Sequence, residues 1–149
     1  MKRLLTAAAL GFAAVTFAPT AAVAADPIYT GLLNNTAVGG YDVVSFFDGE
    51  GVEGSREFET TYKGAEFRFS SADNLARFEA DPEAYAPQYG GYCAWAVSQG
   101  SLAPGDPSTA TIHNGKLYLN VNRSIQNRWD QDRDGFITAA NGNWPGILN

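Results

Sequence analysis

Sulfur is scarce in this sequence: Cys93 is the single cysteine and Met1 the single methionine. One cysteine cannot form a disulfide within its own chain, so a disulfide-stapled scaffold is excluded. No cysteine lies near residues 22–25, which excludes a lipoprotein anchor at the end of the leader described below. His113 is the only histidine, so a copper site could draw only on Cys93, His113 and oxygen donors.

Positive charge is scarce as well. The chain has 10 lysines and arginines against 16 acidic residues, a net charge of −6, and no run of basic residues. If residues 1–25 are removed as a leader, Lys2 and Arg3 are lost with them, and the remaining chain is more acidic still. Such a chain has no electrostatic attraction to nucleic acid or to anionic lipid. We therefore expect no nucleic-acid partner and, after leader removal, no membrane partner.

The first 25 residues have the three parts of a secretory signal peptide. Lys2 and Arg3 precede an uncharged apolar run over residues 4–17, and Ala22-Val23-Ala24 supplies small residues for cleavage. The run is about 14 residues, short of the ~20 that span a bilayer. We predict a signal peptide over residues 1–25, with cleavage after Ala24 or Ala25. The protein is then periplasmic or secreted.

The remaining chain fits a single domain. Residues 26–36 suggest an extended lead-in, and residues 37–149 the domain itself. Tyr41–Phe47 is an apolar, strand-like run. Two hairpins are predicted where strand-like runs flank a short turn, one at Lys63-Gly64 and one at Asn114-Gly115.

Helix signals stand between and after these runs. Capping serines predict a helix over residues 70–79, and Asp81-Pro82 a short second one. We predict a short apolar helix over residues 92–99 that carries Cys93. We also predict a helical tail over residues 124–148 that is interrupted near Asp134-Gly135. The expected fold class is α+β, a small antiparallel sheet of hairpins with short helices packed on it.

Several segments resemble the YHS domain. Phe69–Tyr85 has its aromatic strand, its capped helix and its Asp-Pro-x-x-Tyr ending. Gln88–Val97, Asn114–Asn120 and Asn143–Pro145 are similar to the longer exported branch, whose members are described as YHS domain-containing (seleno)proteins. The resemblance runs from about residue 37 to residue 148 and identifies residues 37–149 as a YHS-like domain.

The resemblance has two implications for a site. Metal-handling relatives, such as the YHS modules of copper-transporting ATPases, carry cysteines at positions that match Ser70 and Asn74. A hydroxyl and an amide are poor ligands for soft metals, so the family's metal site is not expected here. Some members of the selenoprotein branch have selenocysteine at the position that matches Cys93, which implies chalcogen chemistry there in relatives.

Cys93 is the candidate catalytic residue. If a helix begins near Tyr92, its free N–H groups would favour the thiolate form. The leading hypothesis is thiol redox chemistry with an external resolving thiol, or capture of a soft metal ion or a thiol-reactive small molecule. A Cys93–His113 dyad is a further option. The alternative is a non-enzymatic binding or structural domain in which Cys93 is buried, since free cysteines often simply pack.

Residues 130–141 match part of a calcium-binding EF-hand loop. Asp130, Asp132 and Asp134 occupy its acidic positions and Gly135 its glycine position. Position twelve is Asn141, which lacks the bidentate carboxylate that closes the cage. The pattern indicates either a weak calcium site or a solvated helix end with an Asp-Gly turn.

Overall fold

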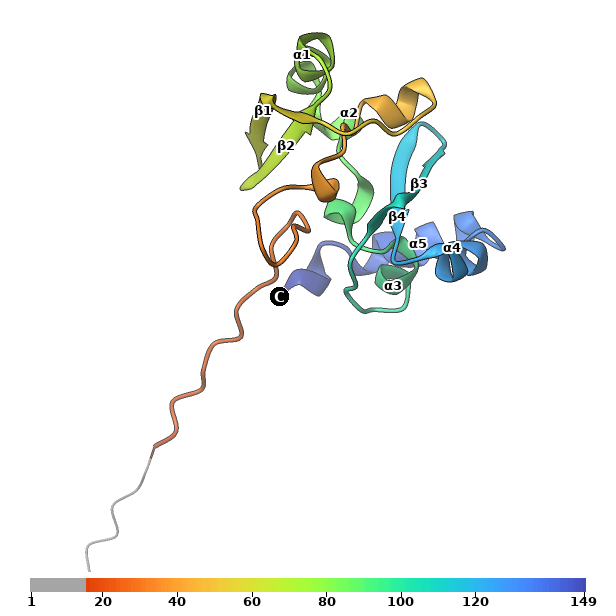
Figure 1. The fold of residues 1–149 in the computed structure, drawn as a ribbon. Helices are drawn as coiled ribbons and strands as arrows, with labels where there is room; N and C mark the ends of the chain where they lie inside the picture. Colours follow the sequence, from red (N-terminus) through yellow and green to blue (C-terminus); the bar gives the residue numbers. More distant parts are fainter. Residues whose placement is uncertain (1–15) are drawn as a thin grey trace, which may run out of the picture.

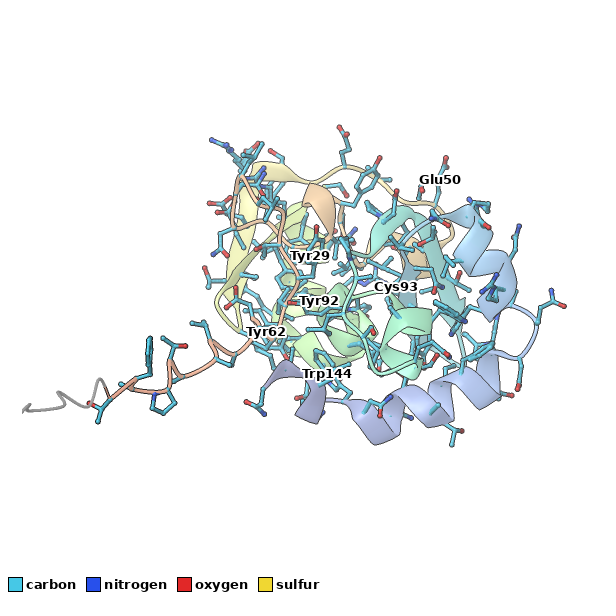
Figure 2. The ribbon with its side chains drawn as sticks, turned by 90° about the horizontal axis from the view of Figure 1, so that it is seen from below. Tyr29, Glu50, Tyr62, Tyr92, Cys93 and Trp144 are labelled. Carbon is cyan, nitrogen blue, oxygen red and sulfur yellow. The ribbon has the colours of Figure 1, made fainter. Side chains whose placement is uncertain are left out.

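The computed structural model describes residues 16–149. Residues 16–26 contain no helix or strand, and the stretch before Ala25 runs outward from the domain (Figures 1 and 2). The predicted signal peptide therefore lies mostly outside the described residues. From residue 16 onward, no helix has both the length and the apolar character needed to cross a membrane.

Both predicted hairpins are present. Strands β1 (Ser55–Tyr62) and β2 (Ala65–Phe69) pair antiparallel, as do β3 (Asp106–His113) and β4 (Lys116–Asn120). The two residues of each turn have positive φ, as a type I′ turn requires. The fold class is α+β, but the hairpins form two separate two-stranded sheets rather than one small sheet.

The helices follow their capping signals. They are α1 (Ala72–Ala80), α2 (Pro82–Tyr85), α3 (Ala94–Ser98), α4 (Arg123–Trp129) and α5 (Arg133–Asn143). Ser71 Oγ accepts a hydrogen bond from Asn74 N at 3.1 Å and so caps α1. The tail breaks before Asp134-Gly135, because Asp132 accepts the Gly135 N–H and starts α5 there.

The strand-like run Tyr41–Phe47 is not a strand, and that prediction is wrong. Tyr41 makes one isolated bridge with Glu53, after which the chain enters a 3-10 helix, Ser45–Asp48. The cause lies in Asp42, whose Oδ1 accepts the N–H groups of Val44 at 2.9 Å and Ser45 at 3.3 Å. Such side-chain bonds to the nearby backbone compete with strand pairing and turn the chain.

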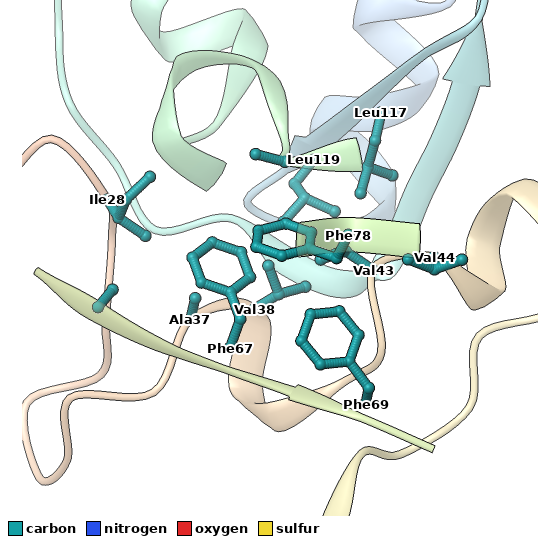
Figure 3. Packing of buried hydrophobic residues seen from close by; sticks show 12 residues of the cluster. Ile28, Ala37, Val38, Val43, Val44, Phe67, Phe69, Phe78, Leu117 and Leu119 are labelled. Carbon is teal, nitrogen blue, oxygen red and sulfur yellow. The ribbon is translucent and has the colours of Figure 1, made fainter. Parts of the chain in front are cut away.

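Strand β4 divides the core into two clusters. Side chains alternate across a strand, so Leu117 and Leu119 face one cluster and Tyr118 faces the other. The first cluster lies under β2 and α1 and contains the stacked rings of Phe67 and Phe78, whose centroids are 4.9 Å apart (Figure 3). The second lies among α3, α4 and α5, the lower part of the domain in Figure 1. Strand β4 thus contributes side chains to both halves of the domain.

The lead-in belongs to the packed domain. Ile28 is buried in the first cluster, and Tyr29 N donates to Gly90 O at 2.8 Å. Asp26 O accepts the Tyr92 hydroxyl at 2.9 Å, and Ala25 N donates to Leu148 O at 2.7 Å. The start of this segment is therefore fixed beside the last residues of the chain.

Candidate functional site

Cys93 lies in the interior, immediately before α3. Its exposed fraction is 0 %. Its backbone N–H donates to Ala103 O at 2.9 Å, and its Sγ lies 3.5 Å from Asn120 Oδ1, within the range of an S–H···O contact. In Figure 2 Cys93 lies among the helices and strands, farther from the leader than Tyr92. The thiol is packed against β4 and has no open face.

The N-terminus of α3 differs from the expected helix start. The helix begins at Ala94 with Cys93 as its N-cap residue, but the cysteine side chain makes no capping bond. Asn120 Oδ1 instead accepts the Trp95 N–H at 3.1 Å. One of the N–H groups that could have favoured a thiolate, that of Trp95, is therefore occupied by an amide oxygen from β4. A helix of five residues also offers little dipole to an anion.

Asn120 is itself held rigidly at the end of β4. It is fully buried, its N–H donates to Thr109 Oγ1 at 2.7 Å, and its carbonyl accepts the same hydroxyl at 2.8 Å. Asn120 Nδ2 has no hydrogen-bond partner among residues 16–149. Asn120 thus links the Cys93 thiol and the Thr109 hydroxyl in a buried polar cluster. The sequence hints at it only through an asparagine at the end of an apolar strand.

His113 is engaged away from Cys93. Its Nε2 lies 2.8 Å from Asp134 Oδ1, and its ring packs edge-on against Trp129 at a centroid distance of 6.3 Å. This contact ties the end of β3 to α5. Cys93 and His113 contact different partners, so the described structure assembles neither a catalytic dyad nor a copper site from them.

The three aspartates of the predicted calcium loop face three different partners. Asp130 pairs with Arg133 at 2.8 Å, Asp132 caps α5, and Asp134 contacts His113. Asn141, at the closing position, accepts the Tyr89 hydroxyl at 2.9 Å. No group of three or more His, Cys, Asp or Glu residues in the described part of the chain could hold a metal ion. These contacts fit the alternative of a helix end with a turn.

The cap gives a first testable outcome. Asp132→Ala should lower the free energy of unfolding by about 1 kcal/mol, because the first turn of α5 loses its side-chain acceptor. Asp132→Asn, which caps equally well, is the matched control and should stay near the original stability. Urea titrations measure both. If the loop binds Ca²⁺, millimolar Ca²⁺ should raise the melting temperature of the protein, and Asp130→Ala should remove that increase.

Ser70 and Asn74, the positions that the resemblance matched to cysteines, bind a carboxylate of the protein itself. Ser70 N, Ser70 Oγ and Asn74 Nδ2 all donate to Asp42 Oδ2, at 2.9, 2.7 and 2.8 Å. With the two N–H groups on Oδ1, five donors meet one carboxylate that has about four lone-pair sites. This oxygen set is saturated by the protein itself, and no soft donor is present. A hydroxyl and an amide already bound to Asp42 therefore do not fit a soft metal ion.

An open groove lies elsewhere on the domain. It has a volume of about 510 Å³ and is lined by the lead-in, α2 and the segment after it, both hairpin turns and the end of the chain. Tyr62 and Trp144 line it, with Lys63 and Lys116 from the two turns and Glu83 from α2. In Figure 2 Tyr62 and Trp144 lie nearer the leader than Cys93 does.

Sequence reasoning missed both Asp42 and the groove. An aspartate followed by Val-Val-Ser, within an apolar run, is a signal that could have identified a buried carboxylate capping its own chain. The groove has no local signal, because its walls come from five separate segments. Burial raises the pKa of the Tyr89 hydroxyl in its inner wall, with a further contribution from Tyr118.

Comparison with known proteins identifies one part of the chain. Residues 43–89 match the family model of the YHS domain. The chain therefore carries a YHS domain, which spans β1, β2, α1 and α2 and contains the Ser70 and Asn74 positions. No curated protein and no solved structure matches the chain. Cys93, Asn120 and Lys116 lie beyond the matched residues.

Proposed function

We propose that this YHS-domain protein is a non-enzymatic binding protein of the periplasm or the extracellular space, in which Cys93 packs in the core. The observation that carries the proposal is the complete burial of Cys93, with Sγ directed at Asn120 Oδ1. The export part rests on the predicted signal peptide. The groove, which does not include Cys93, has a volume typical of small-molecule sites.

Burial weighs against the thiol hypotheses on steric grounds. Thiol–disulfide exchange requires a second sulfur to approach the attacking thiolate directly. Capture of a soft metal ion or a thiol-reactive molecule requires the same access to Sγ. At Cys93 the backbone of α3, the Asn120 amide and Leu119 of β4 occupy the surroundings. Reaction would first require this part of the core to open.

The rate at which the thiol is modified measures that requirement. Native Cys93 should react with a small aromatic disulfide reagent at least about a thousandfold more slowly than the same thiol in urea-unfolded protein. The reason is that the native thiol reacts only from an opened state, and an opening cost of ~4 kcal/mol corresponds to that factor. Stopped-flow absorbance gives both rates.

A surface thiol provides the matched control. Ser101 is exposed in the loop after α3, so Cys93→Ala combined with Ser101→Cys moves the single thiol to solvent. This variant should react at nearly its unfolded rate. If native Cys93 reacts within tenfold of the Ser101→Cys thiol, the thiol is accessible, and the redox and capture hypotheses replace the one proposed here.

A further inference from the structure

Lysine is rare in this chain and its distribution is uneven. Lys2, Lys63 and Lys116 are the three lysines, so both of those that follow the predicted leader line the same groove. They are 53 positions apart, and the groove brings them together because each is in or beside a hairpin turn. The chain as a whole has a net charge of −6.

The ammonium groups of both lysines remain available. Within residues 16–149, neither has a carboxylate within 4.0 Å, whereas Arg68, Arg77 and Arg133 each pair with an acid. Lys63 Nζ lies 5.2 Å from the centre of the Tyr62 ring, which holds the ammonium over an aromatic face of the groove. Glu83 is the one carboxylate in the lining, so two positive charges face one negative charge.

Three aromatic side chains, Tyr62, Tyr89 and Trp144, line the groove beside its charged groups. Tyr62 closes the end of β1, and its ring also meets Phe78 edge-on at 5.7 Å, which fixes its orientation. Trp144 stands against Tyr89 with ring centroids 6.0 Å apart. Both rings are half-buried, and each leaves part of its surface in the groove. Such surfaces take up flat apolar groups.

From these observations we infer that the groove binds a small organic anion carrying a flat apolar group, and that Lys63 and Lys116 bind its charge. The inference rests on the proposed binding function and specifies its ligand. A polyanion is disfavoured because the acidic protein repels a long chain of negative charge. A small carboxylate or sulfonate meets only the local field of the two ammonium groups, and Glu83 can accept from a hydroxyl or N–H on the ligand.

A matched pair of probes tests the charge requirement. The purified protein is titrated with 2-naphthoate and, separately, with 2-naphthamide, which has the same shape without the charge. We expect naphthoate to bind at least tenfold more tightly, with amide shifts in NMR spectra at Gly90, Gly115 and Lys116. The affinity for naphthoate should fall as sodium chloride screens the ammonium groups.

Variants locate the site. Lys63→Gln and Lys116→Gln should each weaken naphthoate binding about fivefold or more, and the double variant should bring its affinity to that of the amide. Arg56→Gln removes the same charge from the exposed side of β1 and is the matched control. It should leave the affinity unchanged. Circular dichroism of all variants confirms that they remain folded.

Two results would overturn the inference. Equal binding of naphthoate and naphthamide, with shifts at the groove, would leave a binding protein with no preference for anions. The absence of shifts at the groove with either probe would exclude a flat anionic ligand there. Neither result concerns the proposed burial of Cys93, which is contradicted only if the native thiol reacts rapidly with the disulfide reagent.

Discussion

Asp42→Ala is expected to lower the free energy of unfolding by about 4 kcal/mol. The substitution removes the acceptor of five hydrogen bonds, from Val44 N, Ser45 N, Ser70 N, Ser70 Oγ and Asn74 Nδ2. Each buried donor left without a partner costs about 1–3 kcal/mol, and water can reach some of them because Ser70 is exposed. The summed loss exceeds that of an ordinary surface substitution several times over.

The control is an aspartate of the same region without such contacts. Asp73 is exposed in the first turn of α1, and Asp73→Ala should change stability by less than about 0.5 kcal/mol. Asp42→Asn separates shape from charge, because its amide keeps one acceptor oxygen and turns an NH₂ group toward other donors. We expect Asp42→Asn to lower the free energy of unfolding by nearly as much as Asp42→Ala does. If urea titration gives Asp42→Ala and Asp73→Ala the same midpoint, the network does not stabilise the YHS domain.

Gly90→Ala is expected to cost about 3 kcal/mol and to detach the lead-in. Gly90 has φ of 61°, a conformation that costs a residue with a Cβ roughly 1–2 kcal/mol. A Cβ at this position would also overlap the carbonyl oxygen of Pro27, so the lead-in must move. Forced shifts of this kind typically cost about 1–3 kcal/mol. The Tyr29 N–H to Gly90 O bond would be strained in the process.

Gly100→Ala isolates the two contributions. Gly100 has a similar φ of 79°, but nothing lies within 4 Å of a Cβ placed there. This variant should lose only the backbone part, about 1 kcal/mol. Hydrogen exchange should rise at residues 28–30 in Gly90→Ala and not in Gly100→Ala. Equal losses of stability and unchanged exchange would mean that the lead-in does not pack on Gly90 in solution.

Much of the secondary structure was predictable because its signals are local. Asn114-Gly115 specifies a type I′ turn through its own backbone preferences, and Gly64 favours the same turn in the first hairpin. Ser71 and Asp81 cap helices through side chains that reach only three residues along the chain. The strand prediction for Tyr41–Phe47 was wrong because the apolar pattern of this run is typical of a strand. The Asp42 carboxylate instead accepts hydrogen bonds from the adjacent backbone and turns the chain.

The candidate sites depended partly on contacts between segments far apart in the chain. Cys93 at a helix start suggested a reactive thiol, but Asn120, 27 positions later, takes both the sulfur contact and the Trp95 N–H. The aspartates of residues 130–134 have calcium-loop spacing, but Arg133, Gly135 and His113 bind them separately. For Cys93 and Asp134 the deciding partners, Asn120 and His113, lie outside the motif, whereas Arg133 and Gly135 lie within it and bind their aspartates locally.

By itself the sequence determined the hairpins, the helix caps, the α+β class, the presence of a YHS domain and the shortage of soft metal ligands, since residue type and near neighbours suffice for each. Only the tertiary structure decided that Cys93 is buried, that Asp42 gathers five donors, and that Lys63 and Lys116 share a groove. Burial and convergence are properties of segments far apart in the chain, and packing alone brings those segments together.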